Sequence, residues 1–87
     1  MLNGNAKPIR PISTRRKPNR TLTSLRLNSG LSPNQLAFRA EVSGPTVRLA
    51  ERGHVPSPRV QFQIAEVFGL TPLDLWPLEN QKEFASV

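Results

Sequence analysis

Residues 32–35 carry the strongest local signal in the chain, because they have the pattern of a helix start. Ser32 suits the N-cap, Pro33 stands at the first helical position, where its missing N–H does no harm, and Gln35 can complete a capping box. Comparable starts recur and glycines follow the apolar runs, which predicts short helices separated by tight turns. The further starts are Thr21, Ser43, Ser57-Pro58 and Thr71-Pro72, and the stops are Gly30, Gly53, Gly69 and Pro77.

The apolar residues between these signals follow helical spacing rather than the alternation of a strand. In the longest run, Val60, Ile64 and Val67 recur at intervals of four and three residues, which places them on one helix face. We therefore expect an all-α fold, a compact domain of five helices. The expected helices span about residues 22–29, 33–40, 44–52, 58–68 and 72–76.

Length and composition limit the class of protein. The 87 residues make at most one small domain with a modest core. No cysteine is present, so neither a disulfide framework nor a thiolate metal site is expected. No apolar run approaches the roughly 20 residues that span a bilayer, and the N-terminus lacks the apolar stretch of a secretory signal. We expect a cytoplasmic protein without a membrane partner.

Positive charge is concentrated at the N-terminus. The formal net charge is +6, and residues 21–87 contain six basic and six acidic side chains, so the excess lies within residues 1–20. This proline-broken segment has little apolar surface to bury, so we expect a flexible basic arm that binds DNA phosphates by releasing counterions. A solubilising tail is the alternative. The folded domain is expected at residues 21–78 and a C-terminal tail at residues 79–87. The basic residues of the arm are Lys7, Arg10, Arg15, Arg16, Lys17 and Arg20, of which the last four are the expected DNA contacts.

The second and third expected helices lie unusually close in the sequence. A joint of about four residues makes two such helices cross steeply, which is a helix-turn-helix. Ala37 is small enough to permit close approach, Val47 and Ala50 fall three residues apart on one face, and Val42 in the turn should plug the core. Because this pair cannot form a core alone, the other three helices must supply it.

Several short motifs stand in register across residues 22–77. They are Gly30-Leu31-Ser32, Leu36-Ala37, Val42-Ser43, Thr46-Val47, Glu51, Gly53, Pro56-Ser57, Ala65 and the sequence FGLTPLDLW at residues 68–76. This series resembles the lambda-repressor-like helix-turn-helix family (Cro-type, xenobiotic-response-element-like), which implies a DNA-binding fold. The family usually has glycine where Glu41 stands. Its acid at the position of Glu51 is structural, and here it could bind the loop or Arg39.

The exposed face of the third helix is expected to read DNA bases. In the family, the N-terminal half of this helix enters the major groove. Arg48 is the best candidate for a bidentate contact to guanine, while Pro45 and Leu49 could pack on thymine methyls and Gly44 lets the backbone approach closely. The alternatives for Arg48 are a solvated surface arginine or an Arg48–Glu51 pair on the helix. The alternative for Leu49 is a position partly within the core.

Phosphate contacts are expected around the rim of this face. The N-terminus of the second helix presents the N–H groups of Asn34 and Gln35 beside the Ser32 hydroxyl, a natural anion site. The family often carries glutamine where Pro33 stands, so the side-chain part of that contact is absent here. Such contacts fix register and carry no sequence information by themselves. The other expected phosphate contacts are Ser43, Thr46, Arg52 and His54.

The chain lacks the residue combinations that catalysis requires. His54 is the only histidine, which excludes a histidine cluster for a metal ion. There is no Gly-rich phosphate loop and no nucleophile paired with a base. We expect no enzymatic activity, no cofactor and no metal site.

Trp76 has two interpretations. It closes the core beneath the last helix, or it forms an apolar edge for a second subunit together with Leu78 and Phe84. Members of the family commonly bind two-fold operators as dimers. Because few exposed apolar residues are available, we expect a dimer formed on DNA rather than a tight dimer in solution.

Two classes of function follow from these features. The first is a sequence-specific regulator of transcription that binds a double-stranded DNA operator with two-fold related half-sites. It would be a small bacterial or phage repressor of the Cro type, located at the nucleoid. The second is a protein-interaction module on the same fold, such as an antitoxin, while an architectural or excision protein that bends DNA shares the chemistry of the first. The basic arm, Arg48 and Arg52 favour DNA binding, and residues 79–87 lack the long apolar tail that would favour an antitoxin.

Overall fold

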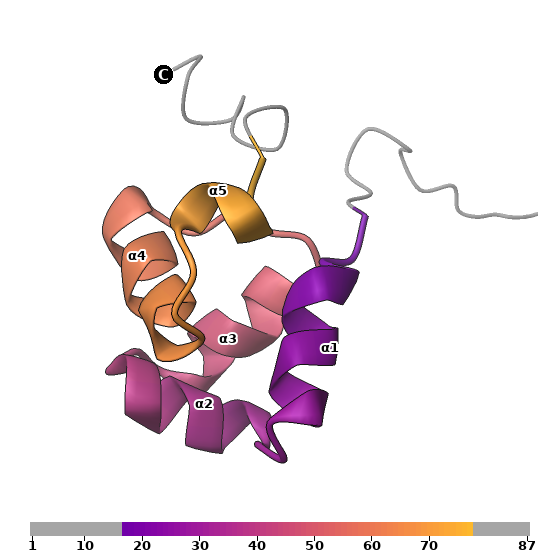
Figure 1. Cartoon of the computed structure of the whole chain (residues 1–87), viewed down its shortest axis with the longest axis vertical. Helices are drawn as coiled ribbons and strands as arrows, with labels where there is room; N and C mark the ends of the chain where they lie inside the picture. The colour runs from indigo at the N-terminus through magenta and orange to yellow at the C-terminus, as the bar shows by residue number, and fades with distance from the viewer. Residues whose placement is uncertain (1–16, 78–87) are drawn as a thin grey trace, which may run out of the picture.

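Five helices follow one another along residues 17–77, the part of the chain that this computed structural model describes (Figure 1). The predicted all-α class with five helices is confirmed over these residues. The predictions for residues 1–16 and 78–87 lie outside the described part. The helices are α1 (Arg20–Asn28), α2 (Pro33–Ala40), α3 (Gly44–Glu51), α4 (Pro58–Val67) and α5 (Pro72–Leu75).

Local capping interactions explain where most helices begin. The Ser32 hydroxyl oxygen accepts the N–H of Gln35 at 3.1 Å, and the side-chain Oε1 of Gln35 accepts the N–H of Ser32 at 2.7 Å. The predicted capping box of α2 is therefore confirmed. At α5, the Asp74 carboxylate instead accepts both the N–H and the hydroxyl of Thr71. The N-caps of α3 and α4 are Ser43 and Ser57, as predicted.

The start of α1 corrects the prediction made at Thr21. Asn19 is the N-cap, because its Oδ1 accepts the N–H of Leu22 at 3.0 Å. Its Nδ2 also donates to the carbonyl of Leu75 at 2.9 Å, which ties the start of α1 to α5. Arg20, assigned to the arm from the sequence, is consequently the first residue of α1. The helix begins before its apolar run because its cap is held by a distant element.

Four of the five helices end one residue earlier than expected. In each case the residue expected to be last is the C-cap instead: Ser29 for α1, Arg52 for α3, Phe68 for α4 and Trp76 for α5. Fraying of a helix end by one residue is common and leaves the packing of each element unchanged.

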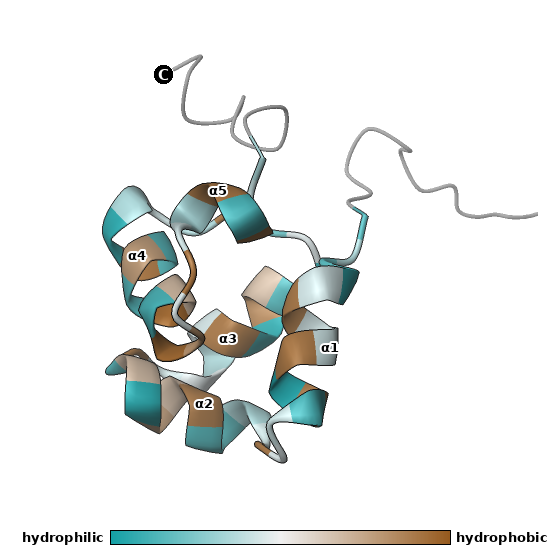
Figure 2. Ribbon diagram, in the orientation of Figure 1, coloured by the Kyte–Doolittle hydropathy of each residue, from teal (hydrophilic) through white to brown (hydrophobic). Residues whose placement is uncertain are grey.

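One apolar cluster holds the helices together. Each helix presents hydrophobic residues on one part of its surface and hydrophilic residues on the rest (Figure 2). Ala37 is 3% exposed and Val42 packs against the cluster, so both predictions about the joint between α2 and α3 are confirmed. Full burial of a large side chain stabilises the fold by roughly 1.5–3 kcal/mol. The largest fully buried apolar side chains are Leu22, Leu36, Val47, Ile64 and Trp76.

The packing places α3 at the centre of the domain. It contacts both α1 and α2, while α4 contacts α2 and α5 (Figure 1). α3 is therefore packed against two helices, while Pro45, Arg48 and Leu49 on its surface are exposed.

Candidate nucleic-acid interface

A tight turn joins α2 to α3. It consists of Glu41, Val42 and Ser43. Glu41 has φ 60° and ψ 42°, the left-handed conformation that favours glycine. The N–H of Val42 then donates to the carbonyl of Ala37 at 2.9 Å, which closes the end of α2. The predicted helix-turn-helix is present, with a glutamate in the conformation that glycine adopts most readily.

The surface of α3 divides into a buried and an exposed side. Val47 and Ala50 are 0% and 1% exposed, so they fix the helix against the core. Pro45 and Arg48 are exposed on the other side, and Leu49 is 42% exposed. The side chains predicted to read bases are therefore accessible, and Leu49 offers apolar surface to a ligand.

Arg48 binds α2 and makes no pair on its own helix. Its Nη2 donates to Oδ1 of Asn34 at 3.1 Å. The alternative of an Arg48–Glu51 pair is wrong, because the Glu51 carboxylate faces α1 and is occupied there. Arg48 thus lies at the N-terminal end of α2, where a DNA phosphate is also expected.

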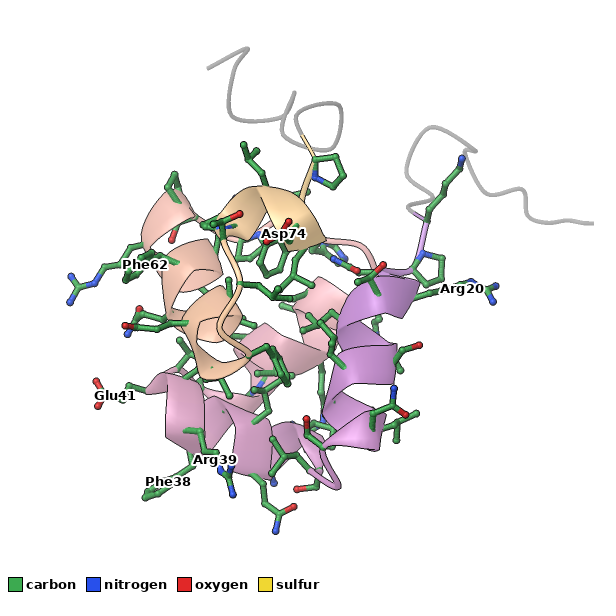
Figure 3. The ribbon with its side chains drawn as sticks, viewed as in Figure 1. Arg20, Phe38, Arg39, Glu41, Phe62 and Asp74 are labelled. Atoms are coloured by element: carbon green, nitrogen blue, oxygen red, sulfur yellow. The ribbon has the colours of Figure 1, made fainter. Side chains whose placement is uncertain are left out.

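Glu51 locks α3 onto α1. Its carboxylate accepts Nε and Nη2 of Arg26 at 2.5 and 3.1 Å, and the hydroxyl of Thr23 at 3.1 Å. Arg26 Nη1 donates to the carbonyl of Leu31 at 2.9 Å. The hydrogen bond that Arg26 donates to Glu51 raises the pKa of Arg26 above its usual value, against the opposing effect of burial. The predicted partner Arg39 is wrong, because it is exposed and points outward from α2 (Figure 3).

A shallow hollow lies where α1, α2 and α3 meet. Arg48 and Arg52 contribute two positive charges to it, and Pro33 brings the first turn of α2 to its edge. Glu51 also lines the hollow, so the charges of its lining residues sum to +1. The residues lining the hollow are Pro18, Thr23, Pro33, Arg48, Glu51 and Arg52.

The capping box changes which groups at the start of α2 can bind phosphate. The N–H of Gln35, predicted to face phosphate, donates to the Ser32 hydroxyl oxygen. This part of the prediction is wrong, because the cap satisfies that donor inside the helix. The Ser32 hydroxyl hydrogen, the N–H of Asn34 and the Gln35 side-chain amide remain as donors for a phosphate.

The hydroxyls at the start of α3 bind each other. The oxygens of Ser43 and Thr46 are 2.7 Å apart, and the Ser43 oxygen also accepts the N–H of Thr46. One hydroxyl hydrogen therefore stays available to a phosphate. Beyond α3, Arg52 and His54 are exposed, so their predicted phosphate contacts are accessible.

The root of the basic arm is attached to the end of α3. The N–H of Asn19 donates to the carbonyl of Glu51, the last residue of α3, at 2.9 Å. Lys17 is exposed, and Arg20 is exposed and points away from α1 (Figure 3). Arg15 and Arg16, the other predicted arm contacts, lie outside the described residues. The chain thus enters the described part next to the face expected to bind DNA.

Trp76 belongs to the core. It is 1% exposed, so the interpretation as the bottom of the core is confirmed. The dimer-interface interpretation of Trp76 is wrong, because so little of its surface can reach a second subunit. Its proposed companions, Leu78 and Phe84, lie outside the described residues.

Metal ligands do not gather in the described part of the chain. Within residues 17–77, no three His, Cys, Asp or Glu side chains are placed to hold an ion. Those residues also include no helix with the length and apolar character needed to cross a membrane.

Comparison with protein families identifies the fold. A family model described as a helix-turn-helix domain matches residues 20–76. The chain belongs to this helix-turn-helix domain family. The match begins with the first residue of α1 and ends just after α5, so it includes every helix described above. No curated protein and no solved structure matches the chain. Membership in the helix-turn-helix domain family supports binding to double-stranded DNA.

Proposed function

We propose that this helix-turn-helix domain is a sequence-specific regulator of transcription, a small bacterial or phage repressor of the Cro type. The observation that carries the proposal is the exposure of Pro45, Arg48 and Leu49 on a helix whose opposite face is fixed in the core. A helix held in this way enters the major groove as a rigid body. It would act in the cytoplasm, at the nucleoid.

Each exposed residue of α3 suits a different part of a base pair. Arg48 donates two parallel hydrogen bonds to O6 and N7 of guanine, a contact worth about 1–3 kcal/mol of discrimination. Pro45 and Leu49 have no hydrogen-bonding side-chain groups, so they pack on thymine methyls. Gly44, at the start of α3, adds no side chain of its own to this face.

Phosphates are bound around this reading face. The start of α2 presents Ser32 and Asn34, and the end of α3 presents Arg52, with His54 just beyond. The arm before α1 adds five of the positive charges, Arg20 at the start of α1 adds the sixth, and residues 21–87 sum to zero. These contacts hold the domain in register and give binding its dependence on salt.

The operator we propose has two half-sites related by a two-fold axis. A half-site separation of one helical turn, about 34–36 Å, lets two copies present α3 to the same side of the duplex. The dimer forms on DNA, with Leu78 and Phe84 as candidate contacts between the copies.

Replacement of Arg48 tests the base contact. The preferred duplex is first obtained by selecting bound fragments from random DNA, and affinities are then measured for this duplex and for a scrambled one. Arg48→Ala should weaken binding to the selected duplex by about 5- to 150-fold more than binding to the scrambled duplex, because removal of a base contact costs about 1–3 kcal/mol.

Arg39→Ala is the matched control. It removes the same charge from an exposed arginine of α2 that points away from the domain. We expect it to leave the ratio of the two affinities unchanged. Equal losses of affinity on both duplexes in Arg48→Ala would show that Arg48 binds phosphate and that α3 reads sequence without it.

A further inference from the structure

The guanidinium of Arg48 is held by α2 before any DNA is present. The hydrogen bond from its Nη2 to Oδ1 of Asn34 spans 14 positions of sequence and joins two exposed side chains. We infer that Asn34 is a positioning residue for the base contact of Arg48, and that Gly44 provides the space in which the two side chains meet. This inference rests on the proposed function, because it concerns how the proposed contact is aimed.

Gly44 has no side chain because the pair occupies the place of one. A Cβ at this position would collide with Oδ1 of Asn34 and would lie 3.0 Å from Nη1 of Arg48. Gly44 begins α3 and does not have a positive φ, so its backbone would accept alanine. Alanine also favours a helix more than glycine does. The absence of a side chain is therefore explained by the space that the pair needs.

The hydrogen bond leaves Arg48 able to read a base. A guanidinium carries five N–H donors, and Asn34 occupies one of them. The remaining donors include those needed for a bidentate contact. An arginine already held in one orientation loses less conformational freedom when it binds a base in that orientation. This raises the affinity for the base that fits the orientation relative to the other bases. Asn34 thereby influences discrimination without touching a base.

A double-mutant cycle tests whether Asn34 acts through Arg48. Asn34→Ala should lower the affinity ratio between selected and scrambled duplexes by about 3- to 10-fold, because the variant removes one solvent-exposed hydrogen bond, whose net contribution is modest. In the Arg48→Ala background the same change should alter the ratio by less than about 2-fold, since the residue it positions is gone. The melting temperature should stay the same, because both side chains are exposed.

Asn28→Ala is the matched control for the removal of an amide. Asn28 is an exposed asparagine at the end of α1, and its replacement should leave the affinity ratio unchanged. Equal effects of Asn34→Ala on the ratio in both backgrounds would show that Asn34 contacts DNA directly, and would overturn the positioning role.

Gly44→Ala tests the space between the two side chains. In the wild-type background the added methyl should force the pair apart and lower the ratio by about as much as Asn34→Ala does. In the Asn34→Ala background the decrease should be much smaller, because the truncated side chain leaves room for the methyl. A methyl that collided with DNA instead would cause the same decrease in both backgrounds, which would contradict the inference.

The cycle separates failure of this inference from failure of the proposed function. If Arg48→Ala leaves the affinity ratio of the two duplexes unchanged, Arg48 does not contact a base. The proposed function then lacks its main base-contacting residue. If Arg48→Ala lowers the ratio while Asn34→Ala leaves it unchanged, the base contact stands and only the positioning role is contradicted.

Discussion

At the scale of single residues, the carboxylate of Glu51 joins α3 to α1. Arg26 and Thr23 both donate to it, and the side chains of the ion pair are 12% and 13% exposed. Removal of one partner from a mostly buried pair leaves the other partner desolvated without compensation. The pKa of Arg26 is higher in the folded protein than in the unfolded chain. The contribution of Arg26 to the free energy of unfolding is therefore complete below the unfolded pKa, and it is lost only as pH rises through the folded pKa. Both lie far above neutral pH.

We predict that Glu51→Ala lowers the free energy of unfolding by about 2–4 kcal/mol, because Arg26 and Thr23 lose their acceptor. Urea denaturation measures this change. Glu66→Ala is the control, since Glu66 is an exposed glutamate of α4 for which the described residues provide no hydrogen-bond partner. If the two variants unfold at the same urea concentration, Glu51 does not support α3 as described.

At the scale of the helices, a helix start could be predicted from the sequence where its cap involves only residues close in sequence. Ser32 and Gln35 act within one turn, so their capping box is visible in the sequence. Asn19 was missed because its choice as a cap depends on contacts with Glu51 and Leu75, which are distant in sequence. The partners of Glu51 and Arg48 were missed for the same reason. The packing angles of α1, α2 and α3 decide them, and no local pattern encodes those angles.

In the turn between α2 and α3, the residue type at position 41 does not suit the backbone conformation there. Glu41 is left-handed, a conformation in which Cβ is unfavourable. We predict that Glu41→Gly makes the domain about 1 kcal/mol more stable than Glu41→Ala, because only glycine removes Cβ. Both variants remove the same exposed carboxylate, so thermal unfolding of the two isolates the backbone effect. An alanine variant as stable as the glycine variant would contradict this account of the turn.

At the scale of the whole molecule, the net charge and the exposed face of α3 belong to different segments of the chain. The excess of +6 lies in residues 1–20, and the remainder of the chain is neutral overall. The helices place Arg48 and its neighbours on one exposed face, and Asn19 ties the root of the arm to the end of α3. We therefore propose that the domain supplies discrimination between sequences and the arm supplies attraction to any duplex.

The most direct test of this division compares the full chain with a chain that lacks residues 1–17. The affinity of each is measured for the selected and the scrambled duplex over a range of salt concentrations. Asn19 is kept, so the cap of α1 and the melting temperature should be preserved. Without the arm, affinity for both duplexes should fall, and the slope of log affinity against log salt should decrease by about 0.9 for each phosphate that the arm no longer neutralises. The ratio between the two duplexes should stay the same. A ratio that collapses on deletion, or affinities and slopes that do not change, would contradict the account.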